Sequence, residues 1–572
     1  MRVQARPASN RNLDADNLHP VLRRIYATRG VASTSELDLS LAQLWPISRL
    51  KGVEQAAALL AEKIVAGETL LIVGDYDADG ATSTALAMLA LSACGAQTVD
   101  YLVPNRFDFG YGLTPELVEV AAERKPGLII TVDNGISSIA GVARASELGI
   151  PVLVTDHHLP AERLPAAAAI VNPNQPGDDF PSKHLAGVGV LFYLMVALQK
   201  QLKSDGWFER RGLPDPSPAD WLDLVAVGTV ADLVPLDRNN RILVSQGLRR
   251  IRAGRCCPGI RALLEVANRS LSRAVASDIG FVVGPRLNAA GRLEDMGLGI
   301  ECLLTDSPQA AGEMAEELDR LNRSRRAIEQ EMRQQAERSL ERLHRLSEGE
   351  LPDGLCLYDP EWHQGVVGIL ASRIKDQYHR PVIAFADGGE GVLKGSARSI
   401  SGLHMRDLLE RIASRHPGLV PRFGGHAMAA GLSLERTNFE AFKAAYESEV
   451  SASVEPAMLQ GTLLTDGELR EEELCLDLAQ LLRDAGPWGQ GFPEPLFEGE
   501  FRLLQQRVVG ESHLKLRLGM LPGGDAIDGI AFNQPALGSE VSRVKLAYRL
   551  DVNEFRGLRT PQLIVEYIQS TP

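Results

Sequence analysis

Residues 70–83 read LLIVGDYDADGATS, and this stretch decides the fold. A short apolar run that ends at a glycine is typical of a buried strand. Three carboxylates follow at every second position, Asp75, Asp77 and Asp79, before Thr82 and Ser83 open an Ala- and Leu-rich helix. Because alternate residues of an extended chain point to the same side, we expect the three carboxylates to converge just beyond the strand. Open α/β sheets bind their ligands at this edge.

The three carboxylates allow two interpretations. Clustered carboxylates repel one another and raise one another's pKa unless a cation lies among them, and a hard divalent cation is the simplest candidate. An Asp-rich solvated turn explains the stretch equally well, since Asp is a common turn and N-cap residue. The rest of the chain has to decide between them.

A strand-then-helix rhythm continues through the first part of the chain. Helices rich in Ala and Glu separate the expected strands, which are Leu70–Val73, Val99–Val103, Leu128–Val132, Val152–Thr155 and Ala169–Val171. This alternation predicts an α/β fold with a mostly parallel, doubly wound sheet.

Acidic and imidazole side chains follow further apolar segments. Asp133 comes directly after the third strand, Asp156, His157 and His158 follow the fourth, and Asp232 follows the apolar segment 221–230. Parallel strands end along one edge, so these groups are expected to meet in one cleft. Their combination favours the metal site over the turn, and it suits two Mn²⁺ or Mg²⁺ ions better than structural zinc. Two such ions clamp the attacking and leaving oxygens of a phosphoryl displacement.

His158 has two candidate roles in such a site. It either handles a proton or contacts the scissile phosphate, or it only orients the neighbouring ligands.

Composition limits the classes of protein that remain. A chain of 572 residues should hold several domains. No apolar run is long enough to span a membrane, and residues 1–12 lack the apolar core of a secretory signal. The six cysteines show no CxxC spacing, which favours reduced thiols in a cytoplasm. A net charge of −14 argues against a wholly basic surface for duplex DNA, but a local arginine-lined groove is enough for one strand.

Several motifs resemble those of the DHH phosphoesterase superfamily. They are DYDADG at 75–80, DNG at 133–135, DHH at 156–158 and Asp232. The segments VPNRFDFGYGL at 103–113 and GPRLNAAGR at 284–292 resemble in particular the bacterial members that degrade single-stranded DNA in the 5′→3′ direction. The match runs from about residue 65 to the C-terminus, in the order of the family.

This resemblance implies roles for the clustered residues. The direct metal ligands would be Asp77, Asp79, Asp133, His157 and Asp232. Asp133 would bridge the two ions, Asp75 would bind an ion or act from behind the ligands, and Asp156 would orient the two histidines beside it.

The resemblance also implies contacts with phosphate groups. Arg106, Arg286, Asn288 and Arg292 are the candidates in the first domain, and a surface turn residue is the alternative for Arg106. Phe107, Phe109 and Tyr111 either stack on bases or pack in the core.

The middle of the chain predicts a connector and a second α/β domain. Ser307 and Pro308 are a good N-cap and N1 pair for one long helix that reaches Leu346. Its cluster of Arg323, Arg325 and Arg326 either contacts a nucleic-acid backbone or forms a solvated face. Residues 349–456 resemble the DHHA1 domain, which implies substrate contacts from Arg373, Ser396, Arg398 and His426.

The last part of the chain has the pattern of a small β-barrel. Five strand-like stretches alternate with turns: Leu496–Val509, His513–Met520, Ala526–Phe532, Arg543–Phe555 and Pro561–Ile568. They are compatible with an OB barrel, a common platform for single strands, and with other small barrels. The family resemblance favours the OB barrel.

Together these observations predict five parts, bounded at 1–50 (an arm), 51–305 (the DHH domain), 306–348 (a connecting helix), 349–456 (the DHHA1 domain) and 457–572 (the OB barrel). The resemblance implies a metal-dependent 5′→3′ exonuclease on single-stranded DNA in recombination and repair, with single-strand-binding protein and a RecQ-type helicase as partners. The alternatives are another DHH phosphoesterase, acting on oligoribonucleotides, cyclic dinucleotides or polyphosphate, and a non-catalytic DNA-binding scaffold.

Overall fold

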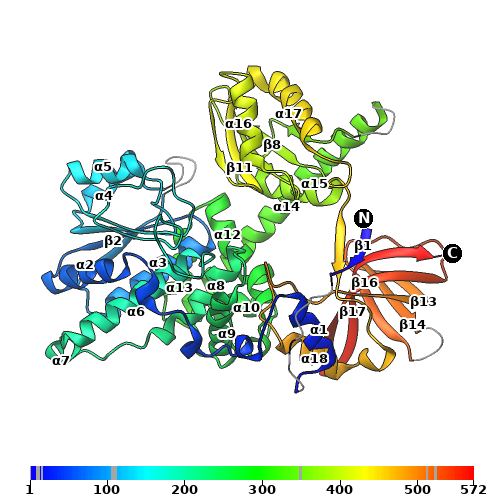
Figure 1. Ribbon diagram of the computed structural model, residues 1–572, viewed down its shortest axis with the longest axis horizontal. Coiled ribbons are helices and arrows are strands. Elements are labelled where there is room, and N and C mark those ends of the chain that lie inside the picture. The colour runs from blue at the N-terminus through cyan, green and yellow to red at the C-terminus, as the bar shows by residue number, and fades with distance from the viewer. Residues whose placement is uncertain are drawn as a thin grey trace. The chain divides into compact units, whose positions relative to one another are not determined.

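The structure is a computed structural model, and it describes residues 2–7, 13, 17–104, 112–346, 351–510, 513–520 and 525–571. The chain divides into two compact units, which Figure 1 shows with their helices and strands. One unit comprises residues 5–319 and 464–572, and the other comprises residues 320–463 with the first four residues.

A parallel sheet organises the first unit. Its order is β3 (Val99–Leu102), β2 (Leu70–Gly74), β4 (Leu128–Val132), β5 (Val152–Thr155) and β6 (Ala169–Val171), and all neighbours are parallel. Helices α4 (Pro115–Glu123) and α5 (Ile139–Glu147) cover one face, and α2 (Val53–Ala66), α3 (Ala78–Ala93) and α6 (Gly187–Ser204) cover the other (Figure 1). The predicted doubly wound sheet is confirmed.

Alternation along each strand explains the two layers. Leu71 and Val73 of β2 and Ile129 of β4 pack on Leu117 of α4 and Val142 of α5. Residues at every second position of a strand share a face, so the intervening side chains face the other helical layer. Because both faces are covered, β2, β4 and β5 are buried along their whole length, as expected for a parallel sheet.

A helical region follows the sheet. It contains α8 (Leu222–Ala231), α9 (Arg238–Arg252), α10 (Pro258–Glu265), α12 (Gly284–Leu293) and α13 (Gly297–Leu304). The apolar segment that was expected to deliver Asp232 is the helix α8, and Asp232 is its C-cap. A π-helical turn, η6 (Ile279–Val283), leads directly into α12.

The C-terminal strands form a closed barrel, which confirms the predicted OB-type barrel. Its order is β13 (Phe497–Val509), β14 (His513–Gly519), β15 (Ile527–Ala531), β17 (Leu558–Thr571) and β16 (Arg543–Phe555). Only the contact between β15 and β17 is parallel among the strand pairs of this barrel that the structure describes. The helix α18 (Leu476–Asp484) packs on β16.

The N-terminal region is attached to the connection that leads into this barrel. In α1 (Pro20–Thr28) the hydroxyl of Tyr26 donates a hydrogen bond to the carbonyl oxygen of Ala485. Arg29 forms an ion pair with Asp466, and the side chains of both residues are almost completely buried. These contacts join residues from the two ends of the chain.

The second unit is built on a mixed sheet of order β10 (Arg422–Gly425), β11 (Ala429–Glu435), β9 (Val392–Arg398), β8 (Val382–Asp387) and β7 (Leu355–Tyr358). Helices α16 (Met405–Arg415) and α17 (Phe439–Ser453) share one apolar core with the sheet. The helix α15 (Val367–Tyr378) and the later part of α14 (Pro308–Leu346) form a second apolar core with the sheet, to which α14 contributes Met332, Ala336 and Leu340. The predicted long helix is therefore present.

No helix among the described residues is long and apolar enough to cross a membrane. The predicted contacts of Arg106, Phe107, Phe109 and Tyr111 lie outside the described residues.

Candidate metal centre and phosphate contacts

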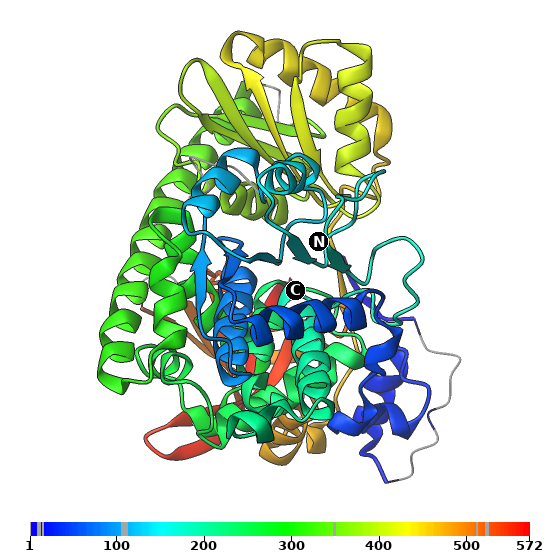
Figure 2. The same ribbon diagram turned by 90° about the vertical axis from the view of Figure 1, so that its left-hand side faces the viewer.

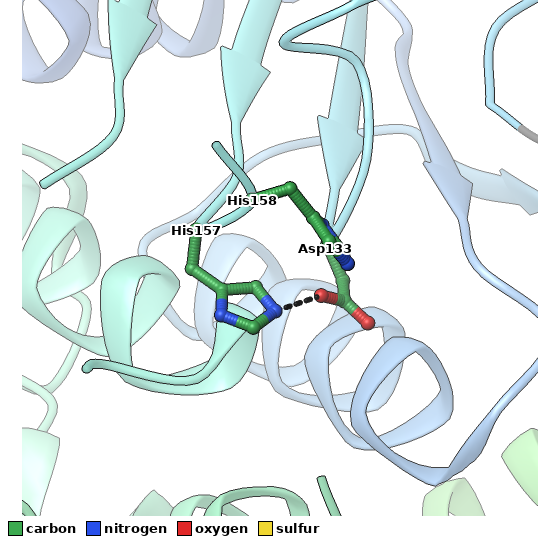
Figure 3. A group of neighbouring side chains, drawn as sticks. All are labelled: Asp133, His157 and His158. Carbon is green, nitrogen blue, oxygen red and sulfur yellow. Dashed lines mark ion pairs between the residues drawn. The ribbon is translucent and has the colours of Figure 1, made fainter. Parts of the chain in front are cut away.

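The predicted acids and imidazoles meet at one edge of the parallel sheet. Three groups of side chains have ligand atoms within 4.8 Å of one another. They are Asp75 with Asp77 and Asp133, Asp79 with His157 and Asp232, and Asp133 with His157 and His158. Every clustered residue that the sequence analysis proposed as a metal ligand belongs to at least one group. Asp133, His157 and His158 are drawn in Figure 3.

The β2–α3 loop reaches this arrangement differently from the prediction. The helix α3 begins at Ala78 and not at Thr82, so Asp79 lies in its first turn. The carboxylate of Asp77 is the N-cap and accepts hydrogen bonds from the backbone N–H groups of Asp79 at 2.9 Å and Gly80 at 3.0 Å. The extended backbone that we expected from the alternation is therefore wrong, although the three carboxylates do lie in the same site. A helical turn, and not strand alternation, brings Asp79 to it.

Asp79 is also fixed by a second helix. Its carboxylate accepts hydrogen bonds from the N–H groups of Gly187 at 2.6 Å and Val188 at 3.0 Å, in the first turn of α6. Helix N-termini stabilise anions because these N–H groups lack partners within the helix. A Cβ atom on Gly187 would lie 2.6 Å from Cβ and Oδ1 of Asp133, so only glycine allows α6 to approach this closely.

Asp133 belongs to two of the three groups. It follows β4 with a φ of 62°, a left-handed conformation that Asp tolerates better than most residues. Nε2 of His157 lies 3.1 Å from Oδ1 of Asp133 and 3.5 Å from Oδ2 of Asp232. Figure 3 shows the His157 ring directed at the Asp133 carboxylate.

Asp156 fixes the two histidines from behind. Its Oδ1 accepts hydrogen bonds from the backbone N–H groups of His157 at 2.7 Å and His158 at 3.0 Å, and it lies 2.8 Å from Nδ1 of His158. Its Oδ2 accepts a hydrogen bond from the N–H of Ile136 at 2.9 Å. The Asp156 carboxylate thus binds both the histidine loop and Ile136, in the loop that follows β4, and it fixes Nδ1 of the half-buried His158.

Burial and mutual repulsion make this cluster unfavourable as a set of bare carboxylates. Burial, followed by the charges of neighbouring carboxylates, raises the pKa of Asp75, Asp133 and Asp232 well above the ordinary value. The same causes raise the pKa of Asp79 to about 7. Bound divalent cations remove this repulsion, and the oxygen and imidazole donors are those that Mn²⁺ and Mg²⁺ accept. The residues therefore fit two divalent cations.

His158 has the opposite electrostatic environment. Burial lowers its pKa, but the hydrogen bond and charge of Asp156, with the charges of Asp75 and Asp77, outweigh burial and raise the pKa to about 9. Burial would likewise raise the pKa of Asp156, but His158 outweighs it and lowers that pKa. The two side chains therefore form an ion pair in the protein without metal.

Two asparagines support the histidine loop and are not among the predicted site residues. The side-chain amide of Asn174 donates to the carbonyl oxygen of His157 at 2.6 Å, and that of Asn172 donates to the carbonyl oxygen of His158 at 3.0 Å. Asn172 follows β6 directly, and Asn174 comes two residues later. The rule that located the other groups, polar residues at the end of a parallel strand, would have located these as well.

The predicted phosphate contacts on α12 have partners within the protein. Arg286 is 8% exposed, and its guanidinium pairs with Asp319 at 2.7 Å and donates to the carbonyl oxygen of Val282. Oδ1 of Asn288 accepts a hydrogen bond from the N–H of Ala78 at 2.8 Å, which ties α12 to the first residue of α3. Arg292 lies in the last turn of α12. Arg286 therefore joins α12 to α14, and Asn288 joins α12 to α3.

In the second unit, two of the four predicted residues form a compact pair. Nη1 of Arg398 donates to the hydroxyl of Ser396 at 3.0 Å and to the carbonyl oxygen of Ala397 at 2.8 Å. A Cβ atom on Gly368 would lie 2.9 Å from Nη2 of Arg398 and 3.0 Å from Oγ of Ser396, so both side chains lie against the first turn of α15.

The other two predicted residues lie at different places in this unit. His426 lies in the connection from β10 to β11, where its N–H donates to the carbonyl oxygen of Ala429. Ala429 is the first residue of β11, and it pairs with Arg398 of the neighbouring strand β9. Nε of Arg373 lies 3.0 Å from Oε1 of Glu329 on α14.

Known families and proteins match this chain over nearly its whole length. Family models match at residues 69–229 (DHH family, N-terminal domain), 352–452 (DHHA1 domain) and 465–567 (RecJ OB domain). The chain is 58% identical over 554 residues to the single-stranded-DNA-specific exonuclease RecJ of Escherichia coli strain K12, covering 96% of each chain. It is 53% identical over 558 residues to the protein of the same name from Haemophilus influenzae, again covering 96% of each chain.

Solved structures agree with these matches. The crystal structure of RecJ in complex with Mn²⁺ from Thermus thermophilus superposes with a TM-score of 0.79 at 34% identity, and the match covers 100% of this chain and 79% of that one. The corresponding structure in complex with Mg²⁺ superposes with a TM-score of 0.74 at 32% identity, and it covers 78% of that chain. With the acids and histidines of the DHH motifs gathered at one sheet edge and this identity along the whole chain, the protein belongs to the RecJ family.

Proposed function

We propose that this protein is a metal-dependent exonuclease that hydrolyses the phosphodiester bonds of single-stranded DNA from the 5′ end. The observation that carries the proposal is the cluster of Asp75, Asp77, Asp79, Asp133, His157 and Asp232 at the carboxyl edge of the parallel sheet. Relatives that are 53–58% identical carry the name of a single-stranded-DNA-specific exonuclease, which supports the substrate and the reaction.

The ligand set accounts for the cofactor. Two Mn²⁺ or Mg²⁺ ions would be held by Asp77, Asp79, Asp133, His157 and Asp232, with Asp133 shared between them. When bound, the ions activate water and neutralise charge on the phosphate that is cleaved. Asp75 supports the β2–α3 loop, where its carboxylate accepts a hydrogen bond from the N–H of Tyr76 at 2.8 Å.

His158 is the residue of the loop that we assign to proton transfer or to contact with the scissile phosphate. Asp156 holds its Nδ1 side, which directs Nε2 away from the loop. A protonated imidazole is the form that donates to a phosphate oxygen or to a leaving group. Asp156 acts through the two histidines that it orients and is a positioning residue.

Ser396 and Arg398 are proposed to bind the terminal 5′-phosphate. No described carboxylate forms an ion pair with Arg398, and burial lowers the pKa of its guanidinium. The cation also lies at the N-terminal end of α15, where the helix dipole is positive. An anion between the guanidinium, the serine hydroxyl and the helix end would satisfy all three. Arg373 and His426 are secondary candidates in the same unit.

The five sequence ranges have different proposed roles in this reaction. We assign catalysis to residues 51–305, substrate binding to 349–456 and strand binding to 457–572, with 1–50 and 306–348 as connecting parts. The proposed setting is the cytoplasm, in DNA recombination, mismatch repair and damage repair, with single-strand-binding protein and a RecQ-type helicase as partners.

One experiment tests the activity and its alternatives. Single- and double-stranded oligonucleotides labelled at the 5′ or 3′ end are digested with Mn²⁺, Mg²⁺ or chelator, beside dinucleotides, cyclic dinucleotides and polyphosphate. We expect release of 5′-terminal nucleotides from single strands only, and only with metal. Preference for dinucleotides or polyphosphate would assign another phosphoesterase activity, and binding without hydrolysis would assign a scaffold.

A further inference from the structure

The helical region beside the barrel carries a concentration of positive charge that the proposed reaction does not use. Between Arg249 and Arg273 the chain has seven arginines and a single carboxylate, Glu265, although the net charge of the protein is −14. They lie on the end of α9, on α10, on the turn η5 (Leu271–Arg273) and in the two short connections between these elements. None of them belongs to the metal centre.

Three of these arginines line a shallow, open pocket of about 490 Å³. Arg252, Arg261 and Arg269 line it together with the hydroxyls of Ser270 and Ser272, and Glu265 is the acidic residue of its wall. Leu271 and Ala253 are its apolar lining residues, so the pocket is mainly polar. Guanidinium and hydroxyl groups that converge on a concave surface are suited to phosphate oxygens.

Much of this charge is not neutralised within the protein. Arg250 pairs with Asp220, and Arg269 lies 3.5 Å from Asp278. By contrast, no described carboxylate forms an ion pair with Arg255 or Arg261, and both side chains are exposed. The guanidinium of Arg261 donates only to the carbonyl oxygen of Gly254, at the rim of the pocket. An unneutralised cluster of this kind attracts a polyanion.

The barrel contributes an exposed aromatic side chain close to these arginines. Arg273 of η5 forms an ion pair with Glu554, near the tip of the hairpin made by β16 and β17, and Figure 2 shows this hairpin beside the helical region. The tip presents Phe555 at 65% exposure and Leu558 at 74%. Arg556 lies over the Phe555 ring at 5.1 Å from its centroid. An exposed aromatic ring with a stacked guanidinium is a platform for an unpaired base.

We propose that the arginine pocket and the β16–β17 tip form a second binding site for a single DNA strand, separate from the metal centre, in which the arginines hold the phosphates and Phe555 stacks on a base. This inference rests on the proposed function, since it places on this surface the part of the strand that has not yet been digested. The mainly polar lining favours phosphates over a peptide, which needs apolar pockets for its anchor side chains. The exposed ring favours a single strand over a duplex, in which the base faces are already stacked.

The test uses the double variant R255E/R261E of the full-length protein. Its matched control is K200E/R210E, which changes the charge by the same amount at exposed positions on α6 and α7 (Trp207–Arg211). Binding of a labelled 40-residue oligo(dT) is measured by fluorescence anisotropy in chelator, over a range of salt concentrations. Hydrolysis of a tetranucleotide, which has too few phosphates to occupy both sites, is measured with Mn²⁺.

We expect R255E/R261E to bind the 40-mer at least about tenfold more weakly than the control. The logarithm of the binding constant should also fall less steeply with the logarithm of the salt concentration, by about 1.4 in slope, which is about 0.7 for each of the two lost phosphate contacts. Tetranucleotide hydrolysis should be unchanged, and Phe555→Ala should weaken 40-mer binding without changing the salt slope. Equal loss in the control, or loss of tetranucleotide hydrolysis, would overturn the proposal.

Two further outcomes would also overturn it. In the first, R255E/R261E binds the 40-mer as the control does but binds a labelled aspartate decapeptide more weakly, which would make this a peptide surface. In the second, duplex DNA competes for binding as strongly as single strands do. Failure of the wild-type protein to bind any single strand would instead remove the proposed function itself.

Discussion

Asp133 is the single residue on which the metal centre depends most. It lies in two of the three ligand groups and is fully enclosed by its neighbours. We expect Asp133→Ala to reduce turnover by more than about 100-fold, because removing a group that only orients a metal ligand already costs about 10–100-fold. The chain should still fold, since the change removes a repelled buried carboxylate. Nuclease assays and circular dichroism test this.

Thermal melting adds an independent readout for Asp133. Mn²⁺ should raise the melting temperature of the wild-type protein, since ions bind the folded state, and should raise that of Asp133→Ala much less. Asp179→Ala, at a side chain that is 76% exposed, is the control. If Asp133→Ala kept its turnover and its response to Mn²⁺, the assignment of Asp133 as the shared ligand would fail.

Arg398 makes a separate prediction at the residue scale. If its guanidinium binds the terminal phosphate, Arg398→Gln should raise KM for 5′-phosphorylated strands by about 10-fold or more, because a hydrogen bond to a charged group contributes about 1.5–3 kcal/mol. KM for strands with a 5′-hydroxyl should change little. Steady-state kinetics with both substrates measures the difference, and an equal rise in the two KM values would exclude a terminal phosphate contact.

At the scale of elements, the approach of α6 to the end of β4 holds the site in shape. Gly187 opens α6, and its N–H binds Asp79 while its Cα faces Asp133. We expect Gly187→Ala to lower stability by about 1–3 kcal/mol, the usual cost of overpacking, and to reduce activity as Asp79 and Asp133 are pushed apart. Denaturant unfolding and nuclease assays measure the two effects.

The matched control is Gly312→Ala on α14, where an added Cβ would meet no atom within 4 Å. It should stabilise the protein by about 0.5–1 kcal/mol, because alanine favours a helix interior over glycine. If Gly187→Ala behaved like this control, the close approach would have no functional importance.

At the scale of the whole molecule, one buried ion pair joins the N-terminal region to the start of the C-terminal barrel region. Asp466 accepts hydrogen bonds from Nη1 and Nη2 of Arg29, the latter at 2.8 Å, and from the N–H of Leu496 at 3.1 Å. Asp466→Ala should cost about 3–5 kcal/mol of unfolding free energy, since it leaves a buried guanidinium without its partner. Urea unfolding tests this.

The exposed pair of Arg49 and Asp179 provides the comparison for Asp466. Exposed ion pairs contribute about 0–1 kcal/mol, so Asp179→Ala should change stability by no more than that. Replacing Arg29 and Asp466 together by Met and Leu should recover much of the loss. A loss in Asp466→Ala as small as that in Asp179→Ala would mean that the N-terminal region is not held by this pair.

The sequence by itself determined the parallel sheet, the long helix, the barrel strands and the acids and histidines of the metal centre, because these depend on local periodicity and on the rule that parallel strands end at one edge. Only the tertiary structure decided how the groups are held. Asp79 enters the site from a helical turn and binds α6, 108 residues further on, and Arg286 pairs with Asp319, 33 residues away. Arg29 and Asp466, 437 residues apart, meet only in the folded chain. Such partners are chosen by packing between distant segments, and no local pattern encodes that choice.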